Sequence, residues 1–302
     1  MIKEHINIQG DHYILYVGYQ HDEKLRLEFN RMTEEFWEFD FENYYKSGYW
    51  DDNCIIYSLF VGDKIVSHTT VSLFAQDEKT LVQLGTVMTD MGYQRKGLSR
   101  FLMGKIMDDF KDKSHGIFLF ANETVLNFYP QFGFVAVTEY EYSLQESNTS
   151  FEKKYTPRQL DLDKPEDLKL FDTLVNVSVA NSDFQTKSIG LAFFYCYAYP
   201  EMGYKESIYY IEELNCVIIA QVEQEVLSIF EVFSPYEIKN EDVICAFADV
   251  AFQEVIFGFT PKNTEGLQHR VYKDDDLQLF VSSGLQAVFE NKRLKINALS
   301  HT

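Results

Sequence analysis

A turn that joins a predicted strand to a predicted helix is the feature that most constrains this chain. Residues 87–99 read VMTDMGYQRKGLS, with small and cationic residues at the turn. The first N–H groups of a helix lack partners and carry partial positive charge, so anions bind there. Gly97 would let the backbone approach an anion, and Arg95 and Lys96 would add charge. Alone the pattern is weak, because an ordinary charged turn before an amphipathic helix looks the same.

A second motif follows after one more predicted helix and strand. Residues 122–134 read NETVLNFYPQFGF. Around the two motifs, segments with the apolar periodicity of strands alternate with segments that have the apolar periodicity of helices. In the first half we expect strands at 12–19, 54–61, 65–74, 81–89, 117–121 and 134–142, and helices at 23–39, 97–110 and 125–132.

The second half repeats part of this order. Residues 145–163 are polar, include Pro157 and lack hydrophobic periodicity, which indicates a linker. Two similar α+β units are therefore the simplest account, with domains at 1–147 and 160–302. In the second unit we expect strands at 207–212, 216–222, 226–233, 255–260, 277–281 and 287–296, and a helix at 241–253.

The first motif resembles the pyrophosphate motif of the GNAT superfamily, the acyl-CoA-dependent N-acyltransferases. That motif, Q/R-x-x-G-x-G/A, follows the fourth strand of the family's fold. Here Gln94, Gly97 and Ser99 fill its positions, with serine in place of the last small residue. The substitution is small and should leave the approach to the turn open.

The second motif resembles the family's downstream pattern, N-x-x-A-x-x-F-Y-x-x-x-G-F. It fits in register from Asn122 to Phe134, with Val125 in the alanine position. The resemblance covers about residues 12–145. It implies a GNAT fold, which is a mixed, mainly antiparallel sheet flanked by helices, with the second half as a further unit of that fold.

The resemblance also implies acetyl-CoA as co-substrate and a primary amine, on a small molecule or a peptide, as acceptor. The pantetheine arm would pair with the strand backbone at Val87, Met88 and Thr89. Asn122 would position the cofactor or a helix. The pyrophosphate would be held at the turn, by Gln94, Arg95, Lys96, Gly97, Leu98 and Ser99.

Tyr129 stands where the family carries the general acid that protonates the departing thiolate. The amine would attack the thioester directly, without a covalent enzyme intermediate. A phenol with a pKa near 10 stays protonated at neutral pH and can donate a proton. The alternative is a tyrosine that only packs on a short helix.

The general base has no clear candidate. Many family members carry a glutamate on the fourth strand, but residues 81–87 read LVQLGTV and hold no carboxylate. An amine with a pKa near 10.4 must lose a proton before it attacks. The remaining candidates are His68, an acidic residue in the aromatic segment 41–50, and the C-terminal carboxylate of Thr302; His68 is more often simply a strand histidine.

The aromatic segment, FENYYKSGYW, lies where this fold shapes the acceptor pocket. Tyr45, Tyr49 and Trp50, together with Tyr44, would line an apolar or cation-binding site. The alternative is that these rings cover the core of the first unit. Acidic side chains at Glu42, Asp51 and Asp52 lie nearby in the sequence.

The second unit lacks the motif. Aligned on the first, it places Lys239, Asp242 and Ile244 where the glutamine, glycine and serine stand, and Asp242 would repel a pyrophosphate. We therefore expect a degenerate GNAT-like unit without a cofactor site. In some tandem members of the family the chain terminus reaches the active site, which makes residues 300–302 a candidate, with a frayed terminus as the default.

Composition excludes several classes. With 27 Lys and Arg against 47 Asp and Glu, the net charge is −20, which argues against nucleic acid as a partner. Seven histidines and four cysteines show no metal-ligand spacing. We expect no signal peptide and no membrane span, and hence a cytoplasmic protein. The oligomeric state, including a homodimer, stays open.

These observations predict an acetyl-CoA-dependent N-acetyltransferase. The alternative is a GNAT shell that binds acyl-CoA as a sensor or scaffold without catalysis. The missing carboxylate favours the alternative slightly, whereas Tyr129 favours the enzyme.

Overall fold

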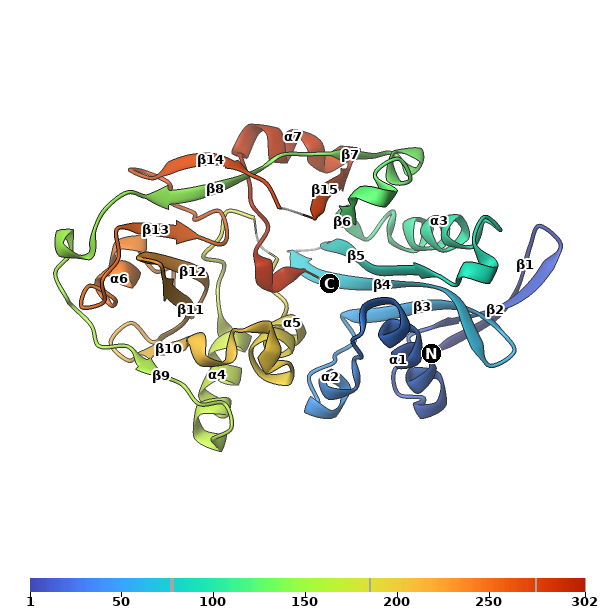
Figure 1. Ribbon diagram of the computed structural model, residues 1–302, viewed down its shortest axis with the longest axis horizontal. Helices are drawn as coiled ribbons and strands as arrows, with labels where there is room; N and C mark the ends of the chain where they lie inside the picture. The colour runs from blue at the N-terminus through green and yellow to red at the C-terminus, as the bar shows by residue number, and fades with distance from the viewer. Residues whose placement is uncertain (77–78, 185, 275, 302) are drawn as a thin grey trace. The chain divides into compact units, whose positions relative to one another are not determined.

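The computed structural model describes residues 1–302 except 77–78, 185, 275 and 302. The chain divides into two compact units, each built around its own sheet (Figure 1). The first unit holds Met1–Val137 and Asp276–Gln286, and the second holds Thr138–Asp275 and Ala287–His301. The expected boundary at 147–160 therefore differs from the observed division, because each unit takes residues from both halves of the sequence.

The first unit contains an eight-stranded sheet among the described residues. Its neighbours pair antiparallel, except that β5 and β6 run parallel. In spatial order the strands are β1 Ile2–Ile8, β2 Asp11–Val17, β3 Cys54–Val61, β4 Lys64–Gln76, β5 Lys79–Thr89, β6 Ser114–Asn122, β15 Leu277–Ser282 and β7 Phe134–Ala136.

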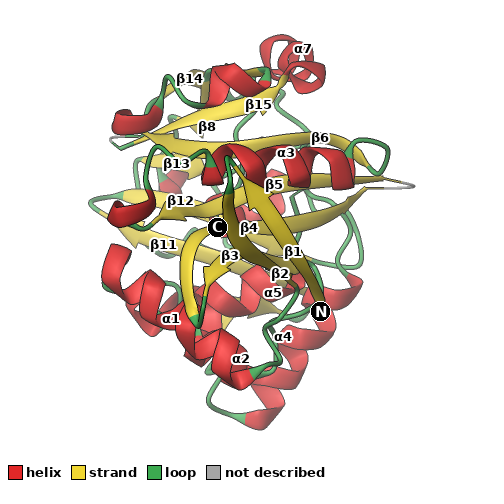
Figure 2. Ribbon diagram, turned by 90° about the vertical axis from the view of Figure 1, so that its right-hand side faces the viewer, coloured by secondary structure: helices red, strands yellow, loops and turns green. Residues whose placement is uncertain are grey.

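Helices cover both faces of this sheet. Figures 1 and 2 show α3 (Leu98–Phe110) on one face and α1 (Glu23–Trp37) with α2 (Glu42–Ser47) on the other. The Asp22 side chain caps α1 by accepting from the Leu25 N–H at 3.1 Å. Helix α3 buries Leu98, Leu102 and Ile106 at the spacing of one helical face, which places its apolar stripe on the sheet.

The second unit contains a seven-stranded sheet in the described part of the chain. Its pairs are antiparallel except β12 with β13. Helices α4 (Pro165–Val177), α5 (Ile189–Phe193) and α6 (Asn240–Cys245) belong to this unit. In spatial order the strands are β14 Gln268–Tyr272, β8 Glu139–Leu144, β13 Glu254–Phe257, β12 Val226–Phe233, β11 Cys216–Glu223, β10 Ile208–Ile211 and β9 Arg158–Gln159.

The two units exchange one strand each. β15 lies late in the sequence but pairs with β6 and β7 of the first sheet. β8 follows β7 directly but pairs with β13 and β14 of the second sheet. The expected single strand at 134–142 is therefore wrong, since the chain leaves the first sheet after Ala136. The strand expected at 277–281 is present, but in the first unit rather than the second.

Two further expectations fail near the C-terminus. Residues 287–296 were expected to form a strand, but Ser283–Lys292 is the helix α7, which buries Leu285 and Phe289 four residues apart. The helix expected at 241–253 ends at Cys245 and continues as turns. The expected α+β class, with two mixed sheets flanked by helices, is confirmed.

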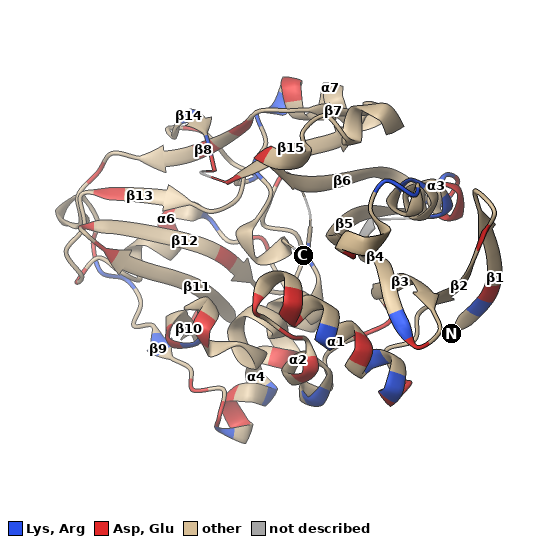
Figure 3. Ribbon diagram, turned by 45° about the vertical axis from the view of Figure 1, so that its right-hand side comes forward, with Lys and Arg blue, Asp and Glu red and all other residues tan. Residues whose placement is uncertain are grey.

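Charge is distributed without regard to the division into units. Figure 3 shows Asp and Glu along helices, strands and loops of both units. The net charge of −20 therefore marks no single acidic segment.

Candidate functional site

The end of β5 has one unpaired edge. β5 pairs with β6 only from Thr80 to Leu84. The opposite edge of β6 pairs with β15, from Phe118 to Asn122. On its other edge β5 stays paired with β4 up to Thr89. In the described residues, the backbone of 85–89 thus offers hydrogen-bonding groups on one side to an extended ligand.

A bulge marks the start of this open edge. Thr86 has a φ of 44°, a left-handed conformation that is uncommon for a branched residue. The β4–β5 register shifts between His68 and Thr70 at the same level. The hydroxyls of Thr86 and Thr70 share a short hydrogen bond across the bulge. Bulges re-aim strands and are common beside functional sites, so this one turns the end of β5 away from β6.

A chain of buried polar side chains leads away from the bulge. Thr70 Oγ1 is hydrogen-bonded to His68 Nε2 at 2.9 Å, and His68 Nδ1 to Ser58 Oγ at 2.7 Å. Ser58 Oγ in turn shares a 2.5 Å hydrogen bond with the Tyr19 hydroxyl. His68 is fully buried, and burial lowers its pKa to about 3. This imidazole therefore stays neutral, which fits a structural strand histidine and makes it a poor base.

We predict that His68 makes stability depend on pH. The unfolded chain takes up a proton near pH 6.5, whereas the folded chain does so only near pH 3. Stability is therefore full above about pH 6.5 and falls as the pH drops toward 3. Between about pH 8 and about pH 5 the loss from His68 should be about 2 kcal/mol.

Urea unfolding of wild type and His68→Gln at both pH values tests this prediction. The variant should lose about 2 kcal/mol less than wild type on acidification, whatever its own stability. His301, whose pKa burial lowers to about 4, contributes equally in both proteins. An identical pH dependence in the two proteins would contradict a buried neutral imidazole.

The turn after β5 has a backbone conformation that would let an anion come close to its N–H groups. The Asp90 side chain accepts from the Gly92 N–H at 2.8 Å and begins a short 3-10 turn. Arg95 and Gly97 have φ values of 61° and 79°, both in the left-handed region. Gly97 is the N-cap of α3 and supplies no side-chain cap, so among the described residues the first N–H groups of α3 have no capping side chain.

The cationic residues of the turn differ in their surroundings. Gln94 and Arg95 are exposed. Lys96 Nζ lies 3.7 Å from Asp11 and 5.0 Å from the centre of the Tyr93 ring. An anion at the turn would thus meet Arg95 directly and would compete with Asp11 for Lys96.

The serine that departs from the family motif has a contact of its own. Ser99 Oγ and Thr89 Oγ1 share a 2.7 Å hydrogen bond, and Thr89 Oγ1 also bonds Ser67 Oγ at 2.9 Å. These hydroxyls join the end of β5 to the first turn of α3. Glycine or alanine at position 99 could not form this bond. Val87 is half-buried and Met88 is buried, as alternation along a strand requires.

Asn122 ends β6 and holds the following turn. Its Oδ1 accepts from the Thr124 N–H at 3.1 Å and from the Thr124 hydroxyl at 2.6 Å. Of the two roles expected of Asn122, positioning the cofactor or positioning a helix, this contact fits the second. The expected helix at 125–132 is instead two short 3-10 turns, Glu123–Val125 and Tyr129–Phe132.

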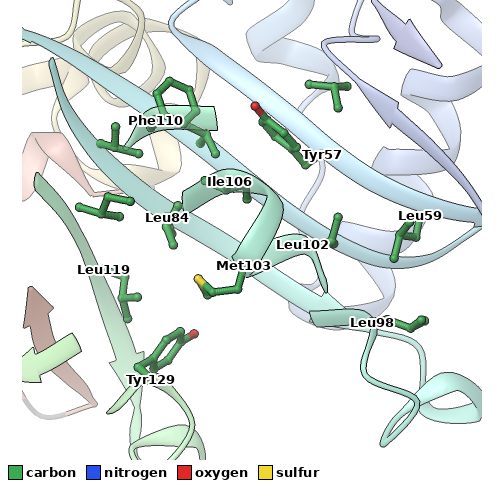
Figure 4. Close-up of a cluster of buried hydrophobic side chains, with 14 of the residues drawn as sticks. Tyr57, Leu59, Leu84, Leu98, Leu102, Met103, Ile106, Phe110, Leu119 and Tyr129 are labelled. Atoms are coloured by element: carbon green, nitrogen blue, oxygen red, sulfur yellow. The ribbon is translucent and has the colours of Figure 1, made fainter. Parts of the chain in front are cut away.

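Tyr129 lies in the buried cluster beneath α3. Figure 4 shows it with Met103 and Leu119, which belong to the same cluster. The side chain is 4% exposed, and its ring lies 5.8 Å from that of Phe280 on β15. Burial raises the pKa of the phenol to about 12, so the hydroxyl is protonated at neutral pH. The described residues give this hydroxyl no hydrogen-bond partner.

The aromatic segment forms α2 and packs largely into the core. Trp50 is 5% exposed and donates its indole N–H to the Cys54 carbonyl at 3.0 Å. Tyr44 is buried and stacks on Trp50. Tyr45 lies under the Arg26 guanidinium at 3.6 Å, and Tyr49 is half-buried. The buried rings match the core-covering alternative, and Tyr45 and Tyr49 stay predictions as pocket residues.

The other candidate bases are engaged or fall outside the described residues. Glu42 accepts from Arg26 Nε at 3.0 Å and from Asn30 at 2.9 Å, and its pKa is lowered, chiefly by the hydrogen bond from Arg26. Asp51 accepts from the Asn53 backbone at 3.0 Å. Thr302 lies outside the described residues.

The tip of the β1–β2 hairpin was not expected at the site. A Cβ added to Gly97 would lie 3.1 Å from Gln9 Nε2, so the hairpin covers one side of the turn. Asp11, on the same hairpin, meets Lys96. The sequence signal is the Gln9–Gly10 pair between two alternating runs, a common hairpin turn.

The corresponding turn of the second unit is closed differently. Lys239 precedes the six-residue α6, and Ile244 is buried in the core of that unit. Asp242 accepts from the Tyr155 hydroxyl at 3.1 Å.

The described residues contain neither a metal-binding cluster nor a helix that could span a membrane. No group of three His, Cys, Asp or Glu side chains there could hold a metal ion. No helix in the same residues is both long and apolar enough to cross a bilayer.

The chain is similar to one known protein family and to several solved structures. Residues 22–134 match the model of the acetyltransferase (GNAT) family. A solved structure from Enterococcus faecalis V583, a conserved protein named a probable N-acyltransferase, has a TM-score of 0.53 at 12% identity, over 88% of this chain and 71% of that one. A GCN5-related N-acetyltransferase from Kribbella flavida has a TM-score of 0.46 at 16% identity, over 88% and 70%. No curated protein matches the chain.

Proposed function

We propose that the first unit, in which residues 22–134 match the model of the GNAT acetyltransferase family, transfers an acetyl group from acetyl-CoA to a primary amine. One observation carries the proposal: β5 parts from β6 after Leu84, and the end of this strand leads into the turn at Gly97. The open edge of β5 would bind the extended pantetheine arm of acetyl-CoA, and the turn at Gly97 would bind its pyrophosphate.

The pantetheine arm would pair with the open edge of β5 at Val87, Met88 and Thr89. Its pyrophosphate would accept from the N–H groups of Leu98 and Ser99, where the dipole of α3 is favourable. The remaining contacts would come from Gln94, Arg95, Lys96 and Gly97. Asn122 would act indirectly, by holding the turn that leads to Tyr129.

Tyr129 would be the general acid. The amine nitrogen attacks the thioester carbonyl, the C–S bond breaks, and the thiolate takes the Tyr129 hydroxyl proton. The phenol suits this role because it is protonated, lies in an apolar surrounding and meets no competing acceptor among the described residues.

The chain supplies no fixed base on β5, and His68 is too weakly basic to remove a proton near neutral pH. The amine would then react as the small neutral fraction present in solution. We predict that kcat/KM rises about tenfold per pH unit from about pH 6 to about pH 9, toward the amine pKa near 10.4. A plateau from about pH 7 would contradict this and indicate a side-chain base.

The acceptor can be identified with a panel of amines. Purified protein would be mixed with acetyl-CoA and one amine at a time, with CoA thiol release as the readout. Aminoglycosides, polyamines, amino acids and peptide N-termini cover the chemistry left open. Tyr45 on α2 and Tyr49, just after that helix, are the proposed lining of the acceptor pocket.

A non-catalytic acyl-CoA binder is favoured by one observation, the lack of a carboxylate on residues 81–87. Such a module would bind acetyl-CoA but release no thiol in response to any amine. The panel therefore separates the two functions.

We propose that the second unit has no CoA site. Its helix α6 begins without a glycine, and Asp242 would repel a pyrophosphate at that position. We further propose that the protein acts in the cytoplasm and does not bind nucleic acid, consistent with its net charge.

A further inference from the structure

The second unit contains a cavity of about 320 Å³. All of its lining residues belong to that unit. They come from β8, β12, β13 and β14, from the C-terminal segment 295–301, and from two residues outside the strands, Tyr204 and Gly258. A volume of this size is at the lower end of those that hold small molecules.

Charged side chains line this cavity although they are at least nine-tenths buried. Glu139 and Glu141 of β8 are each 8% exposed, and Lys295 is 7% exposed. Buried charges are costly unless they are paired and hydrogen-bonded. The hydrogen-bond and ion-pair partners of each group therefore show whether its charge is satisfied within the protein.

Glu141 and Lys295 are satisfied within the protein. Glu141 Oε1 accepts from Arg270 at 2.6 Å, and Glu141 Oε2 accepts from Lys295 Nζ at 3.4 Å. Lys295 Nζ also lies 3.5 Å from the centre of the Tyr272 ring. The protein thus already holds one ammonium group in this cavity, between a carboxylate and an aromatic face.

Glu139 lacks an equivalent partner. Its Oε1 accepts from the Ile296 backbone N–H at 2.8 Å, and in the described part of the chain no side chain donates to its carboxylate. Lys295 and Arg270 both pair with Glu141, so among the described residues no cationic side chain is hydrogen-bonded to Glu139. His301 does not supply a positive charge, because burial lowers its pKa to about 4 and keeps the ring neutral.

Aromatic rings complete the wall of the cavity. Tyr204 and Phe230 both line it and pack edge to face at 5.2 Å. Such rings accept an apolar body and favour a nearby cation.

We propose that this cavity binds a small organic cation, whose ammonium group pairs with Glu139 and whose apolar or aromatic body packs on Tyr204 and Phe230. The occupant would repeat at Glu139 the arrangement that Lys295 makes with Glu141. The proposal rests on the second unit alone and does not depend on the function of the first.

Calorimetric titration of the full chain with benzylamine, without acetyl-CoA, tests the site. Benzylamine carries one ammonium group on an aromatic ring, and benzyl alcohol is its neutral counterpart. We expect benzylamine to bind and benzyl alcohol to bind at least about tenfold more weakly, the usual worth of a charge-assisted hydrogen bond.

Variants locate the binding. Glu139→Gln keeps an oxygen for the Ile296 N–H but removes the charge, and should weaken benzylamine about tenfold. Glu213→Gln, an exposed change in the same unit, is the matched control and should bind as wild type does. Ser228→Leu fills the cavity from β12 and should abolish binding without altering any charge.

The pH dependence is a second readout. Burial raises the pKa of Glu139 to about 7, so its charged fraction grows from about pH 6 to about pH 8 and affinity should rise about tenfold. The other titratable groups beside it are Lys295, Glu141, Arg270, Tyr272, Asp274 and His301. Burial lowers the pKa of His301 to about 4 and raises the pKa of Tyr272 to about 12, so both of these stay neutral between about pH 6 and about pH 8.

Equal binding by wild type and Glu139→Gln, equal binding of benzylamine and benzyl alcohol, or no binding by wild type would each overturn the proposal. Tyr129→Phe should bind benzylamine normally. A failure of catalysis in the first unit is therefore distinguishable from a failure of this site.

Discussion

Replacing Tyr129 by phenylalanine is expected to lower kcat about 100-fold, the lower range for loss of a general acid. The thiolate would then leave without a proton, since the structure places no other hydroxyl of the downstream motif in the buried cluster. The measurement is steady-state CoA release at saturating acetyl-CoA with the best amine of the panel.

The substitution should change little else. The ring of Tyr129 packs against Phe128, Phe134 and Phe280, and phenylalanine preserves these contacts. The thermal shift caused by acetyl-CoA should match wild type. Tyr57→Phe is the control: it removes a buried hydroxyl of the same cluster, one bonded to Asp109, and should leave kcat near wild type. Unchanged turnover in the Tyr129 variant, with unchanged cofactor affinity, would refute the general-acid role.

Replacing Gly97 by glutamate should abolish binding of acetyl-CoA. A side chain at φ 79° is strained, and its Cβ would crowd Gln9 at 3.1 Å. The carboxylate would stand at the start of α3, where the pyrophosphate is proposed to bind, and would repel it. Wild type should melt several degrees higher with excess acetyl-CoA, since a ligand at about 100 times its Kd stabilises by about 2.7 kcal/mol. The variant should show no such shift.

A matched change lies on the same helix. Gly104, in the middle of α3, has open space around its Cβ position, so Gly104→Glu adds the same charge away from the turn. It should keep the shift. Gly97→Ala introduces the backbone strain without the charge, and should keep part of the rise in melting temperature that acetyl-CoA causes. Full protection of the Gly97→Glu protein by acetyl-CoA would place the cofactor elsewhere.

The strand, turn and helix around Gly97 could be largely predicted because their signals are local. A strand, a small-residue turn and an amphipathic helix follow one another within residues 79–110, and each has its own periodicity. The hydrogen bond from Ser99 to Thr89 could not be predicted, because a serine hydroxyl has many potential partners at a turn. The bulge at Thr86 likewise leaves no signal in residue type, since threonine normally favours a regular strand.

The exchange of β8 and β15 escaped prediction for a different reason. Periodicity shows that a segment forms a strand but not which strand it pairs with. Leu277–Ser282 has the pattern of a buried strand in either unit, and its pairing with β6 is set by tertiary contacts far away in the sequence. The error at α7 is related. The expected strand at 287–296 contains the apolar residues Phe289, Leu294 and Ile296, but the helical spacing of Leu285 and Phe289 begins before that range.

We propose that the first unit moves an acetyl group from acetyl-CoA to an amine. Mass spectrometry of the amine after incubation with acetyl-CoA, beside measured thiol release, tests it most directly. The account predicts one acetylated amine per CoA released with wild-type protein, and neither product with Gly97→Glu. Thiol release that is independent of amine, or acetyl-CoA binding without an acetylated product from any amine of the panel, would contradict it.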